Sequence, residues 1–166
     1  MPITFISTGG TIDKVYFDAL SQFEVGESVV SHILREALVP EPHEQIELMR
    51  KDSLEITDAD RALIAKTIRE HSGQHFIVTH GTDTMTDSAL ALGDMGDRTI
   101  VFTGALTPAR FRTNDAVFNL GMAVAAVQTA PPGVYIAMSG QIFPAGAVRK
   151  NRERRCFELL ETPSTN

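Results

Sequence analysis

The sequence of 166 residues is 43% hydrophobic and 22% charged, which is the composition of a soluble globular protein, most simply a single domain. Its formal net charge of −6 argues against a nucleic acid or an anionic membrane as a partner, and no stretch is apolar enough to span a membrane. Cys156 is the only cysteine, so no intrachain disulfide can form. With no export signal at the start, we expect a cytoplasmic protein.

The first dozen residues are the stretch around which the chain is organised. Residues 3–6 are apolar and β-branched or aromatic, which predicts a buried strand that runs directly into Ser7-Thr8-Gly9-Gly10-Thr11. Adjacent glycines allow a sharp turn and a close approach of the backbone to a ligand, at the sheet edge where α/β proteins bind ligands. Taken alone, the stretch is more simply an ordinary glycine turn, and it matches neither glycine-rich phosphate-binding pattern.

The next elements are less regular. Residues 13–25 mix aromatic and charged residues without a period, which predicts a long loop of the kind that often serves as a lid. Apolar residues at helical spacing predict a helix over 28–38, which ends ahead of Pro40 and Pro42. Ile46 and Leu48 alternate with polar neighbours, which indicates a short strand leading to residues 51–53.

Strand and helix alternate through the rest of the chain. Thr57 and the acidic residues after it predict the start of a helix that runs to about His71 and is stopped by Gly73. The elements expected after it are a strand over 76–79, a helix ending near 92, a strand over 99–103, a helix capped by Asn114 or Asp115 and ending near 127, and a strand over 133–138. Residues 139–147 are expected to form a loop or a hairpin, and the residues beyond Arg149 a short polar tail.

This alternation predicts an α/β fold with a three-layer, mostly parallel open sheet and helices on both faces, of the flavodoxin or Rossmann type. The ligand-binding edge of such a sheet is built from the loops that follow the strands. Here those loops are residues 8–11, 52–53, 80–84 and 104–107. The chemistry of the protein is therefore expected in these four segments.

In two of these loops a threonine directly follows a glycine, and one of the two adds an aspartate between two threonines. A threonine hydroxyl is a poor nucleophile until a neighbouring group removes its proton. The helix start after Thr82, Asp83 and Thr84 offers backbone N–H donors to a carboxylate or a developing oxyanion. Asp83 is suited to holding a ligand amino group or orienting a lysine. From the local sequence alone, Thr82 or Asp83 is more simply a helix cap.

Together the two turns resemble those of the bacterial-type L-asparaginase family. The motif Thr8-Gly9-Gly10-Thr11-Ile12 follows the first strand and His80-Gly81-Thr82-Asp83-Thr84-Met85 a later one, in the family's order and at roughly its spacing. Weaker similarity is found at Asp52-Ser53, Thr103-Gly104-Ala105, Asn114-Asp115 and Val148-Arg149-Lys150. The resemblance implies an amidohydrolase that converts asparagine to aspartate and ammonia, with no metal or organic cofactor.

The resemblance also implies roles for individual residues. Thr11 resembles the nucleophile that attacks the side-chain amide and forms an acyl-enzyme. Thr82, Asp83 and Lys150 resemble a second threonine triad, which polarises the attacking group or water. Ser53 matches the position that binds the substrate's α-carboxylate, and Asp83 the one that holds its α-amino group. The substrate site is further expected to include Gly10, Gly81, Thr82 and Ala105, with backbone N–H groups near Thr11 and Thr82 forming the oxyanion hole.

The family's lid tyrosine has two candidate positions in this sequence. A gap-free reading of the lid toward Val25 and Gly26 places Phe23 where the family often has a tyrosine. Tyr16 lies five residues after Thr11, and its phenol can exchange a proton, which Phe23 cannot. We therefore expect Tyr16 to be catalytic, the alternative being a residue that only packs in the lid.

Members of the resembled family normally run to about twice this length, with a smaller second α/β domain. We expect that domain to be absent from this chain, which would weaken substrate binding more than the chemistry. A homo-oligomer is expected to restore part of the closure. The arginines at 149, 152, 154 and 155 surround Lys150 without an assigned role.

Two alternatives to an asparaginase remain. One is another amide hydrolase on the same scaffold, such as a glutaminase or a subunit that releases ammonia for an amidotransferase. The other is an amino-acid-binding module that has lost turnover. The presence of both Thr11 and Thr82 with Asp83 and Lys150 argues against the module, because a binding protein has no need for both threonines.

Overall fold

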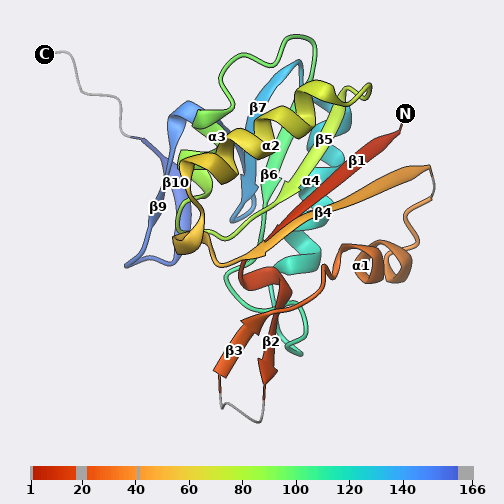
Figure 1. Ribbon diagram of the computed structural model, residues 1–166. Coiled ribbons are helices and arrows are strands. Elements are labelled where there is room, and N and C mark those ends of the chain that lie inside the picture. The colour runs from red at the N-terminus through yellow and green to blue at the C-terminus, as the bar shows by residue number, and fades with distance from the viewer. Residues whose placement is uncertain (1, 18–21, 41, 161–166) are drawn as a thin grey trace, which may run out of the picture.

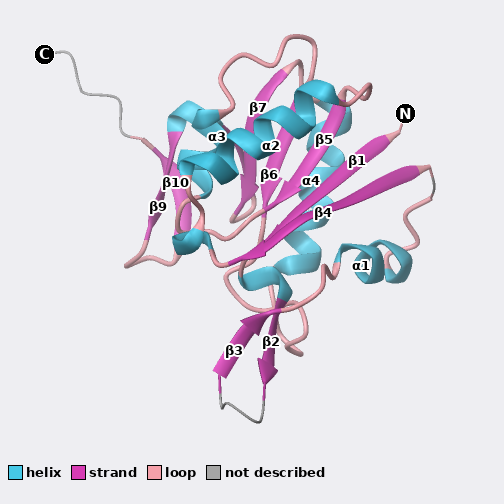
Figure 2. Cartoon of the chain, in the orientation of Figure 1, coloured by secondary structure: helices cyan, strands magenta, loops and turns pink. Residues whose placement is uncertain are grey.

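The computed structural model describes residues 2–17, 22–40 and 42–160, and its centre is a six-stranded sheet (Figures 1 and 2). The strands of this sheet are β1 (Ile3–Gly9), β4 (His43–Lys51), β5 (His75–Thr79), β6 (Thr99–Thr103), β7 (Gly133–Met138) and β8 (Gln141–Pro144). The α-helices of the described residues are α1 (Val30–Glu36), α2 (Asp58–Glu70), α3 (Met85–Ala91) and α4 (Ala116–Thr129).

The order of the strands fixes where a ligand would bind. The sheet runs β4-β1-β5-β6-β7-β8; all neighbours pair in parallel except β8, which is antiparallel to β7. The chain winds outward from β1 to β4, then returns across β1 to β5 and continues in the other direction. The reversal lies between β1 and β5, and such a switch point leaves a crevice at the carboxyl ends of the strands. The flavodoxin-like fold predicted from the sequence is confirmed.

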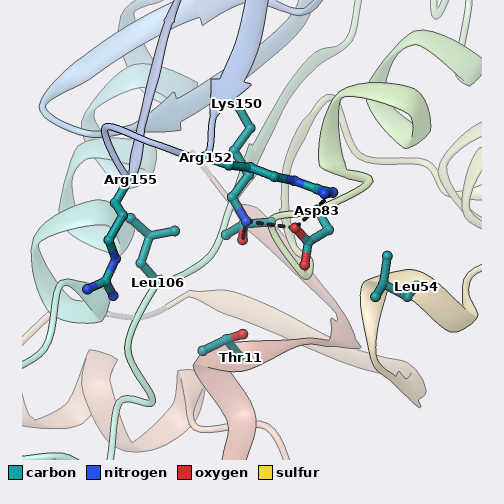
Figure 3. Close-up of a pocket in the computed structure, with 8 residues that line it drawn as sticks. Thr11, Leu54, Asp83, Leu106, Lys150, Arg152 and Arg155 are labelled. Carbon is teal, nitrogen blue, oxygen red and sulfur yellow. Dashed lines mark hydrogen bonds and ion pairs between the residues drawn. The ribbon is translucent and has the colours of Figure 1, made fainter.

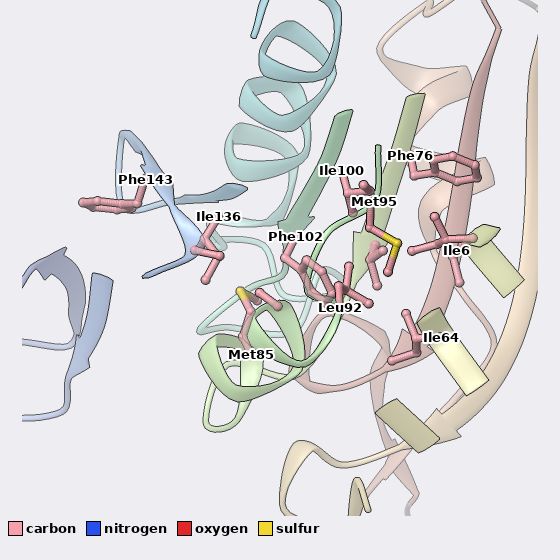
Figure 4. Packing of buried hydrophobic residues seen from close by; sticks show 14 of the residues in the cluster. Ile6, Ile64, Phe76, Met85, Leu92, Met95, Ile100, Phe102, Ile136 and Phe143 are labelled. Carbon is pink, nitrogen blue, oxygen red and sulfur yellow. The ribbon is translucent and has the colours of Figure 1, made fainter. Parts of the chain in front are cut away.

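Successive side chains of the central strands pack into two separate hydrophobic cores, one on each face of the sheet. Phe76 and Val78 of β5 lie in one cluster with α2 and α3, whereas Ile77 lies in the other cluster with α1 and α4. The first cluster also contains Ile6 and Phe102, both fully buried (Figure 4). Helices therefore cover both faces, because every central strand presents apolar residues in both directions.

The residues predicted as a long loop contain a hairpin instead. Strand β2 (Lys14–Phe17) pairs antiparallel with β3 (Gln22–Val25), and the pair projects from the body of the domain (Figure 1). Tyr16 and Phe23 face each other across this hairpin and are 54% and 49% exposed. Because neither face of the hairpin is buried, its sequence lacks the alternation that would have predicted strands.

The residues predicted as a polar tail also form a hairpin. Strand β9 (Val148–Asn151) pairs antiparallel with β10 (Cys156–Leu159), and Phe157 is buried in the same core as α3. A single aromatic residue among charged neighbours gives no periodic pattern from which a strand could be predicted. The buried Phe157 side chain nevertheless anchors β10 in the core. The loop or hairpin predicted over 139–147 is the β7–β8 hairpin.

The two turns at the switch point touch through their backbones. Gly10 has φ of 94°, in the left-handed region that favours glycine, and an added Cβ would lie 2.4 Å from the Gly81 Cα. A Cβ on Gly81 would lie 2.5 Å from the Cβ of Ser53, in the segment after β4. The hydroxyl of Thr8 donates to the carbonyl of Thr79 at 2.9 Å. These contacts bring the ends of β1, β4 and β5 together.

We predict that Gly81→Ala lowers the free energy of unfolding by about 1–3 kcal/mol, because the methyl group overlaps Ser53 and the turns must move apart. Gly121→Ala is the control, since a Cβ there meets no atom within 4 Å, and alanine in a helix should add about 0.5–1 kcal/mol. Urea unfolding of both variants measures the difference. A Gly81→Ala variant as stable as the wild type would contradict the packing described.

Candidate active site

A cavity of about 550 Å³ opens at the switch point. Its walls come from the segments after β1, β4, β5 and β6, together with the β9–β10 hairpin. The lining residues are Thr11, Leu54, Thr82, Asp83, Leu106, Lys150, Arg152 and Arg155 (Figure 3). Four residues proposed from the sequence as catalytic, Thr11, Thr82, Asp83 and Lys150, therefore face one space.

Thr11 begins a single 3₁₀ turn, η1 (Thr11–Asp13), directly after Gly10. The residues on both sides of Thr11 are buried, whereas Thr11 itself is partly exposed and lines the cavity. It lies across the cavity from the Lys150–Asp83 pair (Figure 3). The left-handed Gly10 turn thus exposes the hydroxyl of Thr11 at the carboxyl end of a buried strand.

Lys150 joins two segments that lie far apart in the sequence. Its ammonium group donates to the hydroxyl oxygen of Thr82 at 2.8 Å and to the carboxylate of Asp83 at 2.9 Å (Figure 3). Arg152 adds a second ion pair with the same Asp83 oxygen, at 3.4 Å. The Lys150 side chain is only 17% exposed, so the pair is partly shielded from water. Lys150 therefore orients the Thr82 hydroxyl next to the charged side chain of Asp83.

Ser53 is placed beneath the site rather than in its wall. It is 2% exposed and its hydroxyl oxygen accepts a hydrogen bond from the Asp83 backbone N–H at 3.2 Å. Its carbonyl accepts the Thr84 hydroxyl at 2.7 Å. Both bonds fix the turn that carries Thr82 and Asp83, and Ser53 is not among the residues that line the cavity.

The other predicted binding residues are also buried. Gly10 and Gly81 form the backbone contact under the cavity, and Ala105 is fully buried in the core shared with α4. The wall next to Ala105 is supplied by Leu106, whose backbone N–H donates to the carboxylate of Asp115 at 2.9 Å. Gly10, Gly81 and Ala105 are not among the residues that line the cavity, and a role of their backbone groups toward substrate stays a prediction.

Tyr16 lies on β2, outside the described cavity wall. Its ring meets the edge of Phe23 at a centroid distance of 5.4 Å, and Phe23 in turn contacts Phe111 at 5.8 Å. The hairpin therefore rests on the loop before α4 through aromatic contacts. Of the residues proposed as catalytic, Tyr16 is the one that the structure does not bring into the cavity, and its role stays a prediction.

Sequence reasoning assigned no role to four residues of the wall, namely Leu54, Leu106, Arg152 and Arg155. Leu106 lies within the predicted segment 104–107, and Leu54 is the residue after the predicted segment 52–53, so the rule that loops after strands build the site points to both. The two arginines lie in the turn between β9 and β10, and their place in the wall depends on a hairpin that the sequence pattern did not predict.

His80 is buried and supports the turn that follows β5. It is fully buried, its Nδ1 donates to the Gly81 carbonyl at 2.7 Å, and burial lowers the pKa of its ring to about 4. The ring is therefore neutral near pH 7 and supports the turn ahead of Thr82. Within the part of the chain that the structure describes, no cluster of three His, Cys, Asp or Glu residues could hold a metal ion.

Asp13 is a buried carboxyl group two residues after Thr11. It is 1% exposed and accepts the backbone N–H of Val29 at 2.9 Å, while its own carbonyl accepts Gly26 N–H at 2.9 Å. Loss of hydration raises the pKa of the Asp13 carboxyl to about 6, although the Val29 hydrogen bond acts in the opposite sense. Asp13 thus ties the base of the β2–β3 hairpin to the start of α1.

Comparison with known proteins identifies the family of the chain and relatives over much of its length. The family model "Asparaginase, N-terminal" matches residues 2–164. A probable periplasmic L-asparaginase of Haemophilus influenzae is 30% identical over 163 residues, covering 89% of this chain and 46% of that protein. A 60 kDa lysophospholipase of Homo sapiens is 34% identical over 110 residues, covering 63% of this chain and 19% of that protein.

The fold has a matching solved structure. The thermostable L-asparaginase from Thermococcus kodakarensis superposes with a TM-score of 0.85 and 25% identity, covering 98% of this chain and 52% of that chain. The chain therefore spans about half the length of the asparaginases it matches. No helix among the described residues is long and apolar enough to cross a membrane. Since one relative is named for the periplasm, the cytoplasmic location stays a prediction.

We predict that Asp13→Asn raises stability at pH 7–8 by up to about 3 kcal/mol and has little effect at pH 4. The raised pKa means that the folded protein binds more protons than the unfolded chain between about pH 4 and 6, so the carboxyl group destabilises the fold increasingly as pH rises through that range. Asparagine keeps an acceptor for Val29. Unfolding free energies measured from pH 4 to 8 test this.

At each pH the unfolding free energy of the variant must be compared with that of wild type. The reason is that His80 also titrates in this range, and its effect on stability has the opposite dependence on pH. Its lowered pKa costs stability as pH falls below about 6.5, in variant and wild type alike. Asp94→Asn is a matched control, since that exposed carboxylate also accepts a backbone N–H, from Gly96 at 2.9 Å. Equal effects of Asp13→Asn at pH 4 and pH 8 would contradict the assigned environment.

Proposed function

Because this chain belongs to the asparaginase family and matches its N-terminal domain, we propose that it is an amidohydrolase that converts L-asparagine to L-aspartate and ammonia. One observation carries the proposal: the Lys150 ammonium contacts both Thr82 and Asp83, in the wall of a cavity that Thr11 also lines. A general amino-acid-binding pocket has no use for two threonine hydroxyls of which one is oriented by a lysine.

In the proposed first step, the Thr11 hydroxyl attacks the carbon of the substrate's side-chain amide. The hydroxyl proton is transferred, by way of Tyr16 in this proposal, to the amide nitrogen; a tetrahedral oxyanion forms, and the C–N bond breaks as the protonated nitrogen departs as ammonia. The product is an ester between Thr11 and the acyl group. The exposed position of Thr11 after the Gly10 turn supports this role.

In the proposed second step, water hydrolyses the ester and restores the Thr11 hydroxyl. Thr82, Asp83 and Lys150 would polarise the attacking group in each step, since a hydroxyl held between a lysine and a carboxylate is well placed to accept or donate a proton. The partial burial of Lys150 strengthens these interactions, because water screens them less. We also propose that asparagine is the substrate, that the protein forms a homo-oligomer and that it is located in the cytoplasm.

We predict that Thr11→Ala lowers kcat for ammonia release from asparagine at least about 1,000-fold, because no other group replaces the nucleophile. Thr67→Ala is the control: among the described residues, the Thr67 hydroxyl bonds only the Leu63 carbonyl of its own helix, and the activity of this variant should match wild type. Ammonia released from millimolar asparagine and from glutamine is measured in parallel, which also separates asparaginase from glutaminase. Equal activity of Thr11→Ala and wild type would reject the mechanism.

We predict that Tyr16→Phe lowers kcat about 100-fold if the phenol exchanges a proton with Thr11, because the ring is kept and only the hydroxyl is lost. A steady-state assay over pH 6–9 measures this effect. Phe111→Leu tests the packing alternative, since it alters the aromatic contact under Phe23 without touching the phenol. Unchanged kcat in Tyr16→Phe, with a loss in Phe111→Leu, would show that the hairpin acts through packing.

A further inference from the structure

Two basic side chains contact the same carboxylate in the cavity wall. Among the described residues that line the cavity, Asp83 is the one with an acidic side chain. One of its oxygens, Oδ1, lies 2.9 Å from the Lys150 ammonium and 3.4 Å from the Arg152 guanidinium. An amino-acid substrate brings an ammonium group of its own, which needs a carboxylate in the wall to offset its loss of hydration. The substrate and the protein therefore compete for Asp83.

The direction of β9 explains why both basic side chains reach Asp83. Successive side chains of a strand leave on opposite faces, and this alternation continues into Arg152, the residue after β9. Lys150 and Arg152 thus leave on the same face and extend to Asp83 (Figure 3). Arg149 leaves on the other face, where it pairs with Glu158 at 2.9 Å. The strand that positions Lys150 for the site also brings Arg152 to it.

The two basic side chains are held to different degrees. The Lys150 side chain is 17% exposed, and its ammonium also donates to the Thr82 hydroxyl at 2.8 Å. The Arg152 side chain is 71% exposed. Its contact of 3.4 Å is longer than a charge-assisted hydrogen bond, which measures about 2.7–2.9 Å. Because water and salt screen an exposed ion pair of this kind, Arg152 is the one that an incoming cation can displace.

We propose that the Arg152 guanidinium occupies the place beside Asp83 that the ammonium group of an amino-acid substrate takes, and that the substrate displaces it on binding. The inference rests on the proposed amidohydrolase function and adds to it a residue that sets the affinity of the site. A third cation beside one carboxylate is repelled by the two already there, so Arg152 has to leave. Lys150 keeps its contacts with Thr82 and Asp83, and the catalytic residues stay in place.

The test compares two substrates in Arg152→Gln and wild type. Succinamate keeps the amide and the carboxylate of asparagine and lacks its ammonium group. In Arg152→Gln, KM for asparagine should fall about two- to fivefold, the range expected for loss of an exposed ion pair, with kcat changed less than about twofold. KM for succinamate should not fall, because no cation has to be displaced. If succinamate is hydrolysed too slowly, its inhibition constant against asparagine replaces KM.

Arg154→Gln is the matched control. Arg154 lies in the same turn, pairs with Glu158 at 3.2 Å and is not among the residues that line the cavity, so both KM values should match wild type. Arg152→Lys keeps the charge and should stay closer to wild type than Arg152→Gln. An unchanged or raised KM for asparagine in Arg152→Gln would overturn the inference and leave the proposed function standing. Equal falls for asparagine and succinamate would overturn it as well.

Binding of L-aspartate and of succinate, measured by calorimetry on the same proteins, gives a readout that needs no turnover. Succinate is aspartate without its ammonium group. If no protein releases ammonia, but Arg152→Gln binds aspartate about two- to fivefold more tightly than wild type and succinate no more tightly, the inference stands and the proposed reaction fails. If aspartate binds both proteins equally, or binds neither, the assignment of Arg152 is wrong.

Discussion

The contact between the Gly10 and Gly81 backbones is the constraint on which the site depends. The two turns leave adjacent parallel strands, and side chains at these positions would force them apart by an ångström or more. Their contact sets Thr11 on one wall of the cavity and Thr82 with Asp83 on another. Ser53 packs on Gly81 from a third strand end, so one small region of backbone packing orders three segments of the site.

The second support of the site is the β9–β10 hairpin, which supplies part of the cavity wall. Phe157 anchors it in the core, and Lys150 reaches from it to Thr82 and Asp83. Lys150 is thereby positioned by packing that is remote from the chemistry. The interactions that hold the site are thus of two kinds, close backbone packing on one side and a partly buried ion pair on the other.

Much of the fold could be predicted because the central strands are buried on both faces. Residues 76–79 and 99–103 are nearly continuous apolar runs, and Thr57 forms the helix cap that its sequence indicates, with its hydroxyl accepting the Asp60 N–H. The β2–β3 hairpin and β10 escaped prediction because exposed strands lack that pattern. Sequence motifs identified four residues of the cavity wall, namely Thr11, Thr82, Asp83 and Lys150. The position of Arg155 in the wall depends on a left-handed backbone angle that the sequence does not reveal.

The most direct test of the central claim is to trap the covalent intermediate. Wild type mixed with asparagine and quenched in acid is digested, and the peptides are analysed by mass spectrometry. The account predicts an aspartyl ester on the peptide that contains Thr11, and its absence from the peptide that contains Thr82. An ester found on Thr82, or rapid turnover with no ester on either peptide, would contradict the account.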